Sequence, residues 1–374
     1  MKIGLVCPYN MFLGGGVQEV VLELQNNLTK RGYDAKIITP QPRDYKGPRQ
    51  SNIIMVGGAA RWRTYGTTTQ FSASVDIDKL TSMLETEKFD ILHFHEPWAP
   101  MLARQILGKS NAVNIGTFHA AIPDRIVGKT IEKVITPYTK SILKYLDALT
   151  AVSPAASKYA STLTDMPIEI VQNGIDLKKF SRRKEKSNLN KPIDILYIGR
   201  LESRKGLKYL LKAFSLIESE NPNYRLTIAG DGPDRDKLIE QAEFENIKNI
   251  NFVGYISDSE KIRLLSEADL FCSPAVYGES FGIVLLEAMA SGCVLVAGNN
   301  PGYESVMDGL GQISIINPKD TKEFARRLKV MATNKAIRKC WRGWAQERVK
   351  KNDYDIIVSQ YEEIYKRTYA RKKT

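Results

Sequence analysis

Short apolar runs rich in β-branched residues alternate with longer amphipathic stretches along nearly the whole chain. The pattern begins at residue 3, continues to about residue 171 and restarts at residue 193. Such alternation is typical of βαβ units, in which parallel strands form a sheet with helices on both faces. We therefore expect an α/β fold of doubly wound domains, in which ligands bind beyond the carboxyl ends of the strands.

The periodicity predicts most elements directly. In the first half we expect strands at residues 3–7, 35–39, 53–56, 91–95, 114–118, 148–152 and 169–171, and helices at 17–30, 77–87 and 130–146. In the second half we expect strands at 193–198, 225–229, 250–253, 270–273 and 294–297, helices between them, and a last amphipathic stretch at about 355–369.

A polar, basic stretch at residues 181–192 ends in proline and is the best candidate for a linker. At 374 residues the chain is long for one hydrophobic core, so two domains are expected. The N-terminal apolar run is too short for a secretory signal, and no run approaches the length of a membrane span.

Charge and cysteine content restrict the possible partners. The four cysteines lack paired spacing, which favours reduced thiols in an intracellular compartment and excludes a zinc site built from them. An excess of 54 Lys+Arg over 42 Asp+Glu gives a net charge of +12, which suits phosphates, nucleic acid or an anionic bilayer. Because the charge is dispersed rather than gathered in one stripe, we expect no nucleic-acid partner.

The segment YGESFGIVLLEAMASG, residues 277–292, places Glu279 in a glycine-bracketed loop and Glu287 in a helix that is apolar on every side. Such helices are buried, and a buried ionised carboxylate needs a partner. The backbone N–H groups of residues 281–284 open the helix and suit an anion. Either glutamate alone could be a helix cap or a salt-bridged core residue. The whole segment indicates a nucleotide-sugar site, with pyrophosphate at the helix start and hydroxyl groups on the two carboxylates.

Two cations flank the end of the expected strand 193–198. Arg200 follows the strand and Lys205 opens the next helix, so both lie at the carboxyl edge of the sheet. Two fixed positive charges there would stabilise the negative charge that develops on a departing nucleotide. The alternative for each is an ordinary surface cation, and Arg204, which lies between them, is expected to be solvated.

Glycines and histidines follow strands of the first half. Gly14, Gly15 and Gly16 would let the backbone approach a phosphate or sugar closely, but the run is not GxGxxG, which argues against a nicotinamide dinucleotide. His93 and His95 share one face of a strand without a further metal ligand at suitable spacing, and we interpret them as cleft or packing residues. The neutral imidazole of His119, at a strand tip, could hydrogen-bond a sugar hydroxyl.

These motifs together resemble one known family. In chain order they are KIGLVCPYN with GGGVQ, FDILHFHEP, TFH, VQNGID, IGR with RKG, FVGYISDSEK, ADLFCSP and GESFGIVLLEAMASG. The chain is similar over nearly its full length to the GT-B retaining glycosyltransferases of family 4, and within them to the phosphatidylinositol mannosyltransferases that use GDP-mannose. The resemblance implies two Rossmann-like domains with an interdomain cleft, here residues 1–172 and 173–352, and a final helix at 353–374 that crosses back to the first domain.

The resemblance also implies roles for individual residues. The expected catalytic residues are His119, Arg200, Lys205 and Glu279. The residues expected to bind the nucleotide-sugar are Gly15, Gly16, Ile256, Phe281, Gly282, Ile283, Val284 and Glu287, with Ile256 beside the base and Glu287 on the ribose. No metal and no other cofactor is required in this family.

Departures from the family fall on the acceptor side. The family carries a basic amphipathic helix that contacts anionic membrane, but residues 71–90 hold two lysines against five acids, which would repel such a surface. Positive charge gathers instead at residues 125–144, in the linker and in the C-terminal tail. A lysine expected soon after His119 is replaced by Asp124 followed by Arg125. The remaining candidates for acceptor contacts are Tyr9, Gln18, Arg61 and Arg63.

The resulting hypothesis is transfer of a hexose, with mannose from GDP-mannose as the expected donor, to a phosphatidylinositol-type membrane lipid with retained anomeric configuration. The enzyme would work in the cytoplasm, peripherally at the inner face of the cell membrane. Met11, Phe12, Leu13 and Trp98 are expected to form either an apolar lip for acyl chains or part of the core. The alternatives are a UDP-sugar-dependent family 4 transferase with another lipid or a soluble acceptor, and a nucleotide-sugar epimerase on the same scaffold.

Overall fold

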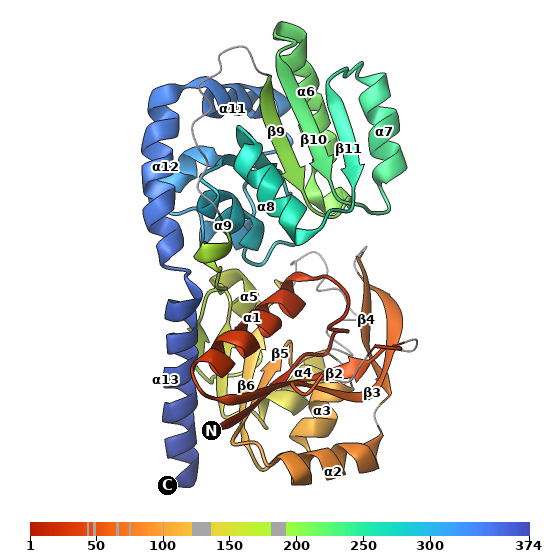
Figure 1. Cartoon of the computed structure of the whole chain (residues 1–374), viewed down its shortest axis with the longest axis vertical. Coiled ribbons are helices and arrows are strands. Elements are labelled where there is room, and N and C mark those ends of the chain that lie inside the picture. Colours follow the sequence, from red (N-terminus) through yellow and green to blue (C-terminus); the bar gives the residue numbers. More distant parts are fainter. Residues whose placement is uncertain are drawn as a thin grey trace. The chain divides into compact units, whose positions relative to one another are not determined.

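The computed structural model describes residues 1–42, 45–47, 50–64, 67–74, 76–99, 101–121, 136–180 and 192–374, with the side chains of 61–64 and 67–74 outside this description. The chain divides into two compact units (Figure 1). The first unit comprises Met1–Gly174 and Tyr354–Thr374, and the second unit comprises Ile175–Asp353.

The described part of the first unit holds one sheet of eight strands in the order β4-β3-β2-β1-β5-β6-β7-β8. All neighbouring pairs are parallel except β3 and β4, which form an antiparallel pair at one edge. The strands are β1 (Lys2–Val6), β2 (Asp34–Gln41), β3 (Ile53–Thr64), β4 (Thr67–Ser74), β5 (Ile91–His95), β6 (Val113–Phe118), β7 (Ala148–Ala151) and β8 (Ile168–Ile170).

Two helices of the first unit, α2 and α5, begin at a residue whose side chain caps them. The side chain of Asp76 accepts a hydrogen bond from the N–H of Lys79 at the start of α2, and Ser153 caps α5, whose first residue is proline. The helices of this unit are α1 (Gly16–Lys30), α2 (Ile77–Glu87), α3 (Leu102–Leu107), α4 (Thr136–Leu143), α5 (Pro154–Ser161) and α13 (Tyr354–Lys373).

The C-terminal helix α13 belongs to the core of the first unit, where it lies beside α1 (Figure 1). Arg31, just after α1, pairs with Glu362 at 2.8 Å, and Lys372 in the basic tail pairs with Asp147 at 2.7 Å. The tail is thus partly neutralised by the unit's own carboxylates, so it is less available to an anionic surface than its sequence suggests. The core residues that α13 contributes are Tyr354, Ile357, Val358, Tyr361, Ile364 and Tyr365.

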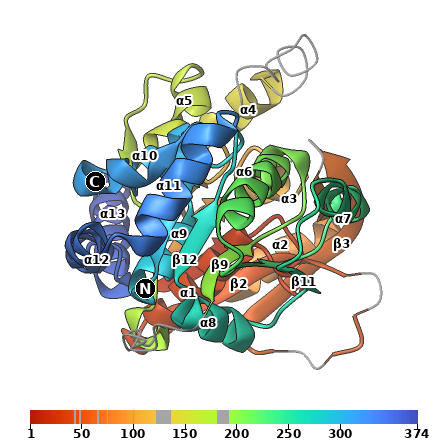
Figure 2. The ribbon, with the colours of Figure 1, turned by 90° about the horizontal axis from the view of Figure 1, so that it is seen from above.

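The second unit is built on a parallel sheet in the order β11-β10-β9-β12-β13-β14. The strand order reverses between β9 and β12, which is where doubly wound sheets bind ligands. Helix α6 packs on α7 and α11 (Figure 2), and α8 packs on α9 (Figure 1). The strands are β9 (Ile193–Ile198), β10 (Tyr224–Ala229), β11 (Ile250–Gly254), β12 (Leu270–Ser273), β13 (Val294–Gly298) and β14 (Ile315–Ile316). The helices are α6 (Leu207–Glu220), α7 (Arg235–Phe244), α8 (Asp258–Glu267), α9 (Ile283–Ala290), α10 (Pro301–Glu304), α11 (Thr321–Thr333) and α12 (Lys335–Lys350).

The twelve predicted strands are confirmed, and their ends agree to within two residues except that β3 runs on to Thr64. Strands β4 and β14 and helices α3, α5, α10, α11 and α12 were not predicted. Residues 130–135 of the expected helix at 130–146, residues 181–191 of the expected linker and residues 122–135, which include Asp124 and Arg125, lie outside the described residues. None of the described helices is long and apolar enough to cross a bilayer.

Candidate active site

The loop after β9 docks against the loop after β12 at the point where the strand order reverses. Gly206 has a φ of 74°, and a Cβ there would lie 2.1 Å from the carbonyl oxygen of Pro274, so only glycine allows this approach. The N–H of Val276 donates to the carbonyl oxygen of Arg204 at 2.8 Å. The backbone therefore holds the cations of the first loop next to the carboxylates of the second.

Five charged side chains form one ion-pair network here: Arg200, Glu202, Arg204, Lys205 and Glu279. Glu202 is buried and accepts from Nε of Arg200 and Nε of Arg204, each at 2.9 Å. Oε1 of Glu279 lies 2.8 Å from Nη1 of Arg204 and 2.7 Å from Nζ of Lys205. The prediction that Arg204 is solvated was wrong, because it is the residue that links the two carboxylates.

The charge balance of this network favours an anion. Three cations face two carboxylates, which leaves one positive charge uncompensated. Burial opposes the charge of Arg204, but Glu279 and Glu202 outweigh it and raise its pKa above the usual value. Arg200 has the most exposed side chain of the three cations, at 44%, so its remaining N–H donors are available to a ligand.

The N-terminus of α9 follows Glu279 directly. Gly282, with a φ of 98°, precedes the first helical residue, Ile283, and no side chain caps this end of the helix. The backbone of Glu279 also meets the loop after β13, since a Cβ on Gly302 would lie 2.0 Å from the carbonyl oxygen of Glu279. The structure thus brings residues 281–284 and Glu279 together at an uncapped helix start, which suits a phosphate.

Glu287 has the partner that its burial requires. It is 7% exposed, and its Oε1 lies 2.7 Å from Nζ of Lys261 on α8, which confirms the prediction of a paired carboxylate. Ile256, expected beside the base, is half-buried in the turn between β11 and α8. The residue assigned to the base and the partner of Glu287 are therefore five positions apart on one turn and helix.

In the first unit, the loop after β1 is folded tightly over the start of α1. A Cβ on Gly15 would lie 2.5 Å from Oε1 of Gln18, whose Nε2 reaches the carbonyl oxygen of Asn10 at 3.4 Å. Gly16 is the first residue of α1. Burial raises the pKa of Tyr9 well above its usual value, with a smaller contribution from Glu96. The neighbouring loop tip, Met11–Leu13, exposes Phe12 and Leu13 by 36% and 44%.

The three histidines form a column of rings. The centroids of His93 and His95 are 4.2 Å apart, and those of His95 and His119 are 5.1 Å apart. A hydrogen bond of 2.9 Å joins Nδ1 of His95 to Nε2 of His119, and Nδ1 of His93 bonds the hydroxyl of Tyr365 on α13 at 2.7 Å. Burial lowers the pKa of His93 and of His119 to about 3, so both are neutral near pH 7. His93 is therefore a packing residue, whereas His119 ends the column at the carboxyl edge.

The structure does not bring all predicted acceptor residues together. Tyr9 and Gln18 lie in or just after the β1 loop. Arg61 and Arg63 lie on β3, and their side chains are outside the described set. Trp98 is half-buried and donates its indole N–H to Oε2 of Glu96, so it is tied to the carboxyl edge.

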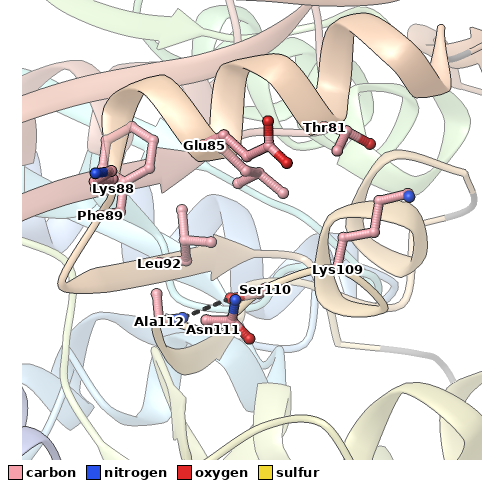
Figure 3. Close-up of a pocket in the computed structure, with 10 residues that line it drawn as sticks. Thr81, Glu85, Lys88, Phe89, Leu92, Lys109, Ser110, Asn111 and Ala112 are labelled. Atoms are coloured by element: carbon pink, nitrogen blue, oxygen red, sulfur yellow. Dashed lines mark hydrogen bonds between the residues drawn. The ribbon is translucent and has the colours of Figure 1, made fainter.

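A pocket of about 420 Å³ opens elsewhere on the first unit (Figure 3). Leu92 lies between Lys88 and Phe89 on one side and Lys109 on the other. Because Leu92 is the second residue of β5 and Ala112 precedes β6, this pocket lies at the amino edge of the strands, opposite His95 and His119. None of the predicted site residues lines it.

Sequence reasoning missed four polar residues in these sites. Glu202 lies between two arginines in GRLESRKG, a pattern that indicates ion pairing. Lys261 is the last residue of the motif FVGYISDSEK, and no role was predicted for it. Arg204 was predicted to be solvated, but its guanidinium pairs with Glu202 and Glu279. Glu96 follows the second histidine of LHFHEP and was treated only as part of a motif, although it is fully buried.

Two family models together match most of the chain. The model described as Glycosyltransferase Family 4 matches residues 14–179, and the model described as Glycosyl transferases group 1 matches residues 178–348.

Similar proteins have mannosyltransferase names. The phosphatidyl-myo-inositol mannosyltransferase of Mycobacterium tuberculosis (strain ATCC 25618 / H37Rv) is 30% identical over 378 residues, covering 98% of this chain and 96% of that protein. The enzyme of the same name from Mycolicibacterium smegmatis is 28% identical, covering 98% of this chain and 93% of that protein.

Solved structures share the fold at lower identity. Sucrose-phosphate synthase from Thermosynechococcus elongatus matches with a TM-score of 0.81 at 18% identity, covering 99% of both chains. Anabaena HepE in complex with UDP-glucose matches with a TM-score of 0.76 at 15% identity, covering 97% of this chain and 99% of that chain. These matches agree with the predicted fold class of two Rossmann-like α/β domains.

Proposed function

The chain belongs to the GT-B glycosyltransferases of family 4, and from this premise we propose that it transfers mannose from GDP-mannose to a phosphatidylinositol-type lipid. The single observation that carries the donor half of this proposal is the ion-pair network around Glu279. It combines an excess positive charge with an uncapped helix start, the two features that a nucleoside diphosphate requires.

We assign the donor groups as follows. Arg200 and Lys205 neutralise the diphosphate together with the amides of residues 281–284, and the two glutamates accept hydroxyl groups. Glu279 receives those of the sugar and Glu287 those of the ribose. Ile256 lies beside the base, Gly15 and Gly16 approach the phosphate, and neutral His119 hydrogen-bonds the transferred hexose.

The chemistry proposed for these groups is substitution with retention and without a metal ion. The bond between the anomeric carbon and the diphosphate oxygen breaks as the acceptor oxygen bonds the same face of that carbon. The proton of the acceptor hydroxyl passes to the departing diphosphate. Catalysis then rests on positioning and on stabilisation of the charge that develops on the diphosphate.

The acceptor half rests on the names of the relatives and on the loop tip Met11–Leu13. Two exposed apolar side chains next to the glycine loop would suit acyl chains, and Tyr9 and Gln18 lie beside them for headgroup contacts. The acceptor-side residues that depart from the family pattern favour a second candidate function. In that function a UDP-sugar is the donor, and another lipid or a soluble molecule is the acceptor.

One experiment tests donor and acceptor together. Purified protein is incubated with GDP-mannose, UDP-glucose and related nucleotide-sugars plus a total lipid extract, and products are read by mass spectrometry, with Glu279→Gln as the inactive control. Mannosylated phosphatidylinositol formed only from GDP-mannose is the expected result. A product from a UDP-sugar, or on another acceptor, supports the second candidate function instead. Conversion of the nucleotide-sugar without any acceptor would identify an epimerase and refute both.

A further inference from the structure

Glu96 is the residue that joins two strand ends of the first unit. It follows β5, is fully buried and has a φ of 54°, a left-handed conformation that residues other than glycine rarely adopt. Its N–H donates to the carbonyl oxygen of Thr117 on β6 at 2.8 Å. Its Oε1 accepts from the N–H of His119 at 2.6 Å and from the N–H of Ala120.

The donors around this carboxylate explain why an acid occupies the position. Oε1 receives two backbone N–H groups and Oε2 receives the indole N–H of Trp98, so both oxygens must accept. A glutamine offers only one acceptor oxygen, and its NH₂ group would meet an N–H donor. The surroundings therefore select for a carboxylate rather than for a polar side chain in general.

The left-handed backbone and the burial of the Glu96 carboxylate both lower the stability of the fold. A left-handed backbone at a residue other than glycine costs about 1 kcal/mol or more, and burying a charge costs more unless hydrogen bonds compensate. Strain of this kind concentrates at functional sites. What Glu96 holds is the turn after β6, which carries His119.

The ring of His119 is fixed by a separate contact. Its Nε2 bonds Nδ1 of His95, which is 1% exposed and whose ring is tilted by 34° against that of His93. Nε2 of His95 has no hydrogen-bond partner among the described residues. The ring of His119 thus depends on His95, whereas its backbone depends on Glu96.

We propose that Glu96 is a positioning residue that holds the backbone of His119 in the orientation required for hexosyl transfer. The proposal rests on the proposed function, in which His119 contacts the transferred hexose. Glu96 touches no substrate in this scheme and acts through His119 alone.

The titratable groups that face Glu96 do not change charge near pH 7, so the charge that varies with pH there is that of Glu96 itself. His95 and His119 are kept neutral by burial, the thiol of Cys7 at the end of β1 has its pKa raised by burial to about 12, and the pKa of Tyr9 is raised as well. Burial also raises the pKa of Glu96 to about 7, against the effect of its three N–H donors. Turnover should therefore fall as the pH drops below about 7, since protonation removes an acceptor.

The test compares Glu96→Gln, His119→Ala and the double variant in the full chain. We expect Glu96→Gln to lower kcat about 30-fold with a change of less than threefold in the KM for the donor, and to abolish the acidic limb of the pH profile. The double variant should be no slower than His119→Ala, because the two residues act as one. Glu96→Asp, which keeps the charge on a shorter arm, should show a smaller loss.

A matched control is available in the second unit. Glu218 is also buried and also accepts two consecutive backbone N–H groups, those of Lys248 and Asn249. Glu218→Gln should leave kcat and the pH profile unchanged. Full kcat in Glu96→Gln, or losses that multiply in the double variant, would overturn the proposal.

A second readout does not depend on activity. The amide proton of His119, bonded to a carboxylate at 2.6 Å, should resonate far downfield in the NMR spectrum and move upfield by about 1 ppm or more in Glu96→Gln, with the His119 side-chain signals also shifted. Unchanged His119 signals would refute the positioning role even if transfer is observed. If the wild-type protein transfers no hexose, the proposed function fails, and the NMR comparison alone then decides whether Glu96 positions His119.

Discussion

Nη1 of Arg204 lies 2.8 Å from Oε1 of Glu279, while Nε of the same guanidinium lies 2.9 Å from Oε2 of Glu202. Arg204 thereby joins the loop after β9 to the loop that precedes α9. The position of the carboxylate assigned to the sugar thus depends on an arginine that the sequence alone gives no reason to select.

Replacing Arg204 by methionine should reduce both activity and stability. Glu202 and Glu279 would be left without a shared partner in a largely buried setting, which costs about 3 kcal/mol. We expect kcat to fall about 100-fold or more and the urea midpoint to drop. Arg263→Met on α8 is the control, because the ion pairs of Arg263 with Glu260 and Glu267 are exposed. Wild-type turnover in Arg204→Met would contradict the assigned role of the network.

Glu287 and Lys261 should behave as a coupled pair in nucleotide binding. Glu287→Gln and Lys261→Met each break the 2.7 Å ion pair that holds the Glu287 carboxylate, so each should weaken GDP binding about tenfold. Calorimetry on the two single variants and the double variant measures the coupling. Purely additive effects would show that the ion pair does not orient Glu287 toward the nucleotide.

The fold could be predicted because periodicity is a local signal. Each parallel strand is a short apolar run, so even β9 and β12 were placed to the residue. Helix α3 spans only Leu102–Leu107, less than two turns, and shows no periodicity. Strand β4, TTTQFSAS, has little apolar content and exists because β3 pairs with it. Its stabilisation is tertiary, and no local pattern encodes it.

The contacts among the predicted charged residues of the second unit could not be read from the sequence. A buried glutamate implies a partner, yet nothing in the sequence selects Lys261, 26 positions away, as the partner of Glu287. Similarly, Arg204 and Glu279 are 75 positions apart and meet because two glycine-dependent loops dock. Arg204 looked like one basic residue among many because burial is a property of the assembled fold.

The pH dependence of stability should change when Glu96 is replaced by glutamine. Burial raises the pKa of this carboxyl from 4.5 to about 7 in the folded protein. Its contribution to stability is fully present below pH 4.5 and is lost as the pH rises through 7, a change of about 3 kcal/mol. The free energy of unfolding of Glu96→Gln relative to wild type should therefore rise by about that amount between pH 4.5 and 8. Parallel curves from urea titrations would argue against a buried titrating carboxyl.

The loop tip Met11–Leu13 should mediate attachment to lipid, and α2 should not. Phe12 and Leu13 are 36% and 44% exposed, so inserting each into a bilayer gains about 1 kcal/mol, and the double change of Phe12→Ser with Leu13→Ser should weaken flotation with vesicles that contain phosphatidylinositol. Ile77→Ser is the matched control, because Ile77 is 52% exposed but begins the acidic helix α2. Greater loss from Ile77→Ser than from the loop tip would place the membrane contact on α2 after all.

The position of α13 also orders events during synthesis. Its aromatic and aliphatic residues complete a core whose other members lie mostly in the first 115 positions of the chain. A ribosome that has translated those positions must still add the entire second unit before Tyr361 and Tyr365 exist, and must then let the last helix leave the exit tunnel. The core of the first unit is therefore completed only after the second unit has been made, and a nascent chain would expose part of its apolar surface to chaperones until α13 has been added.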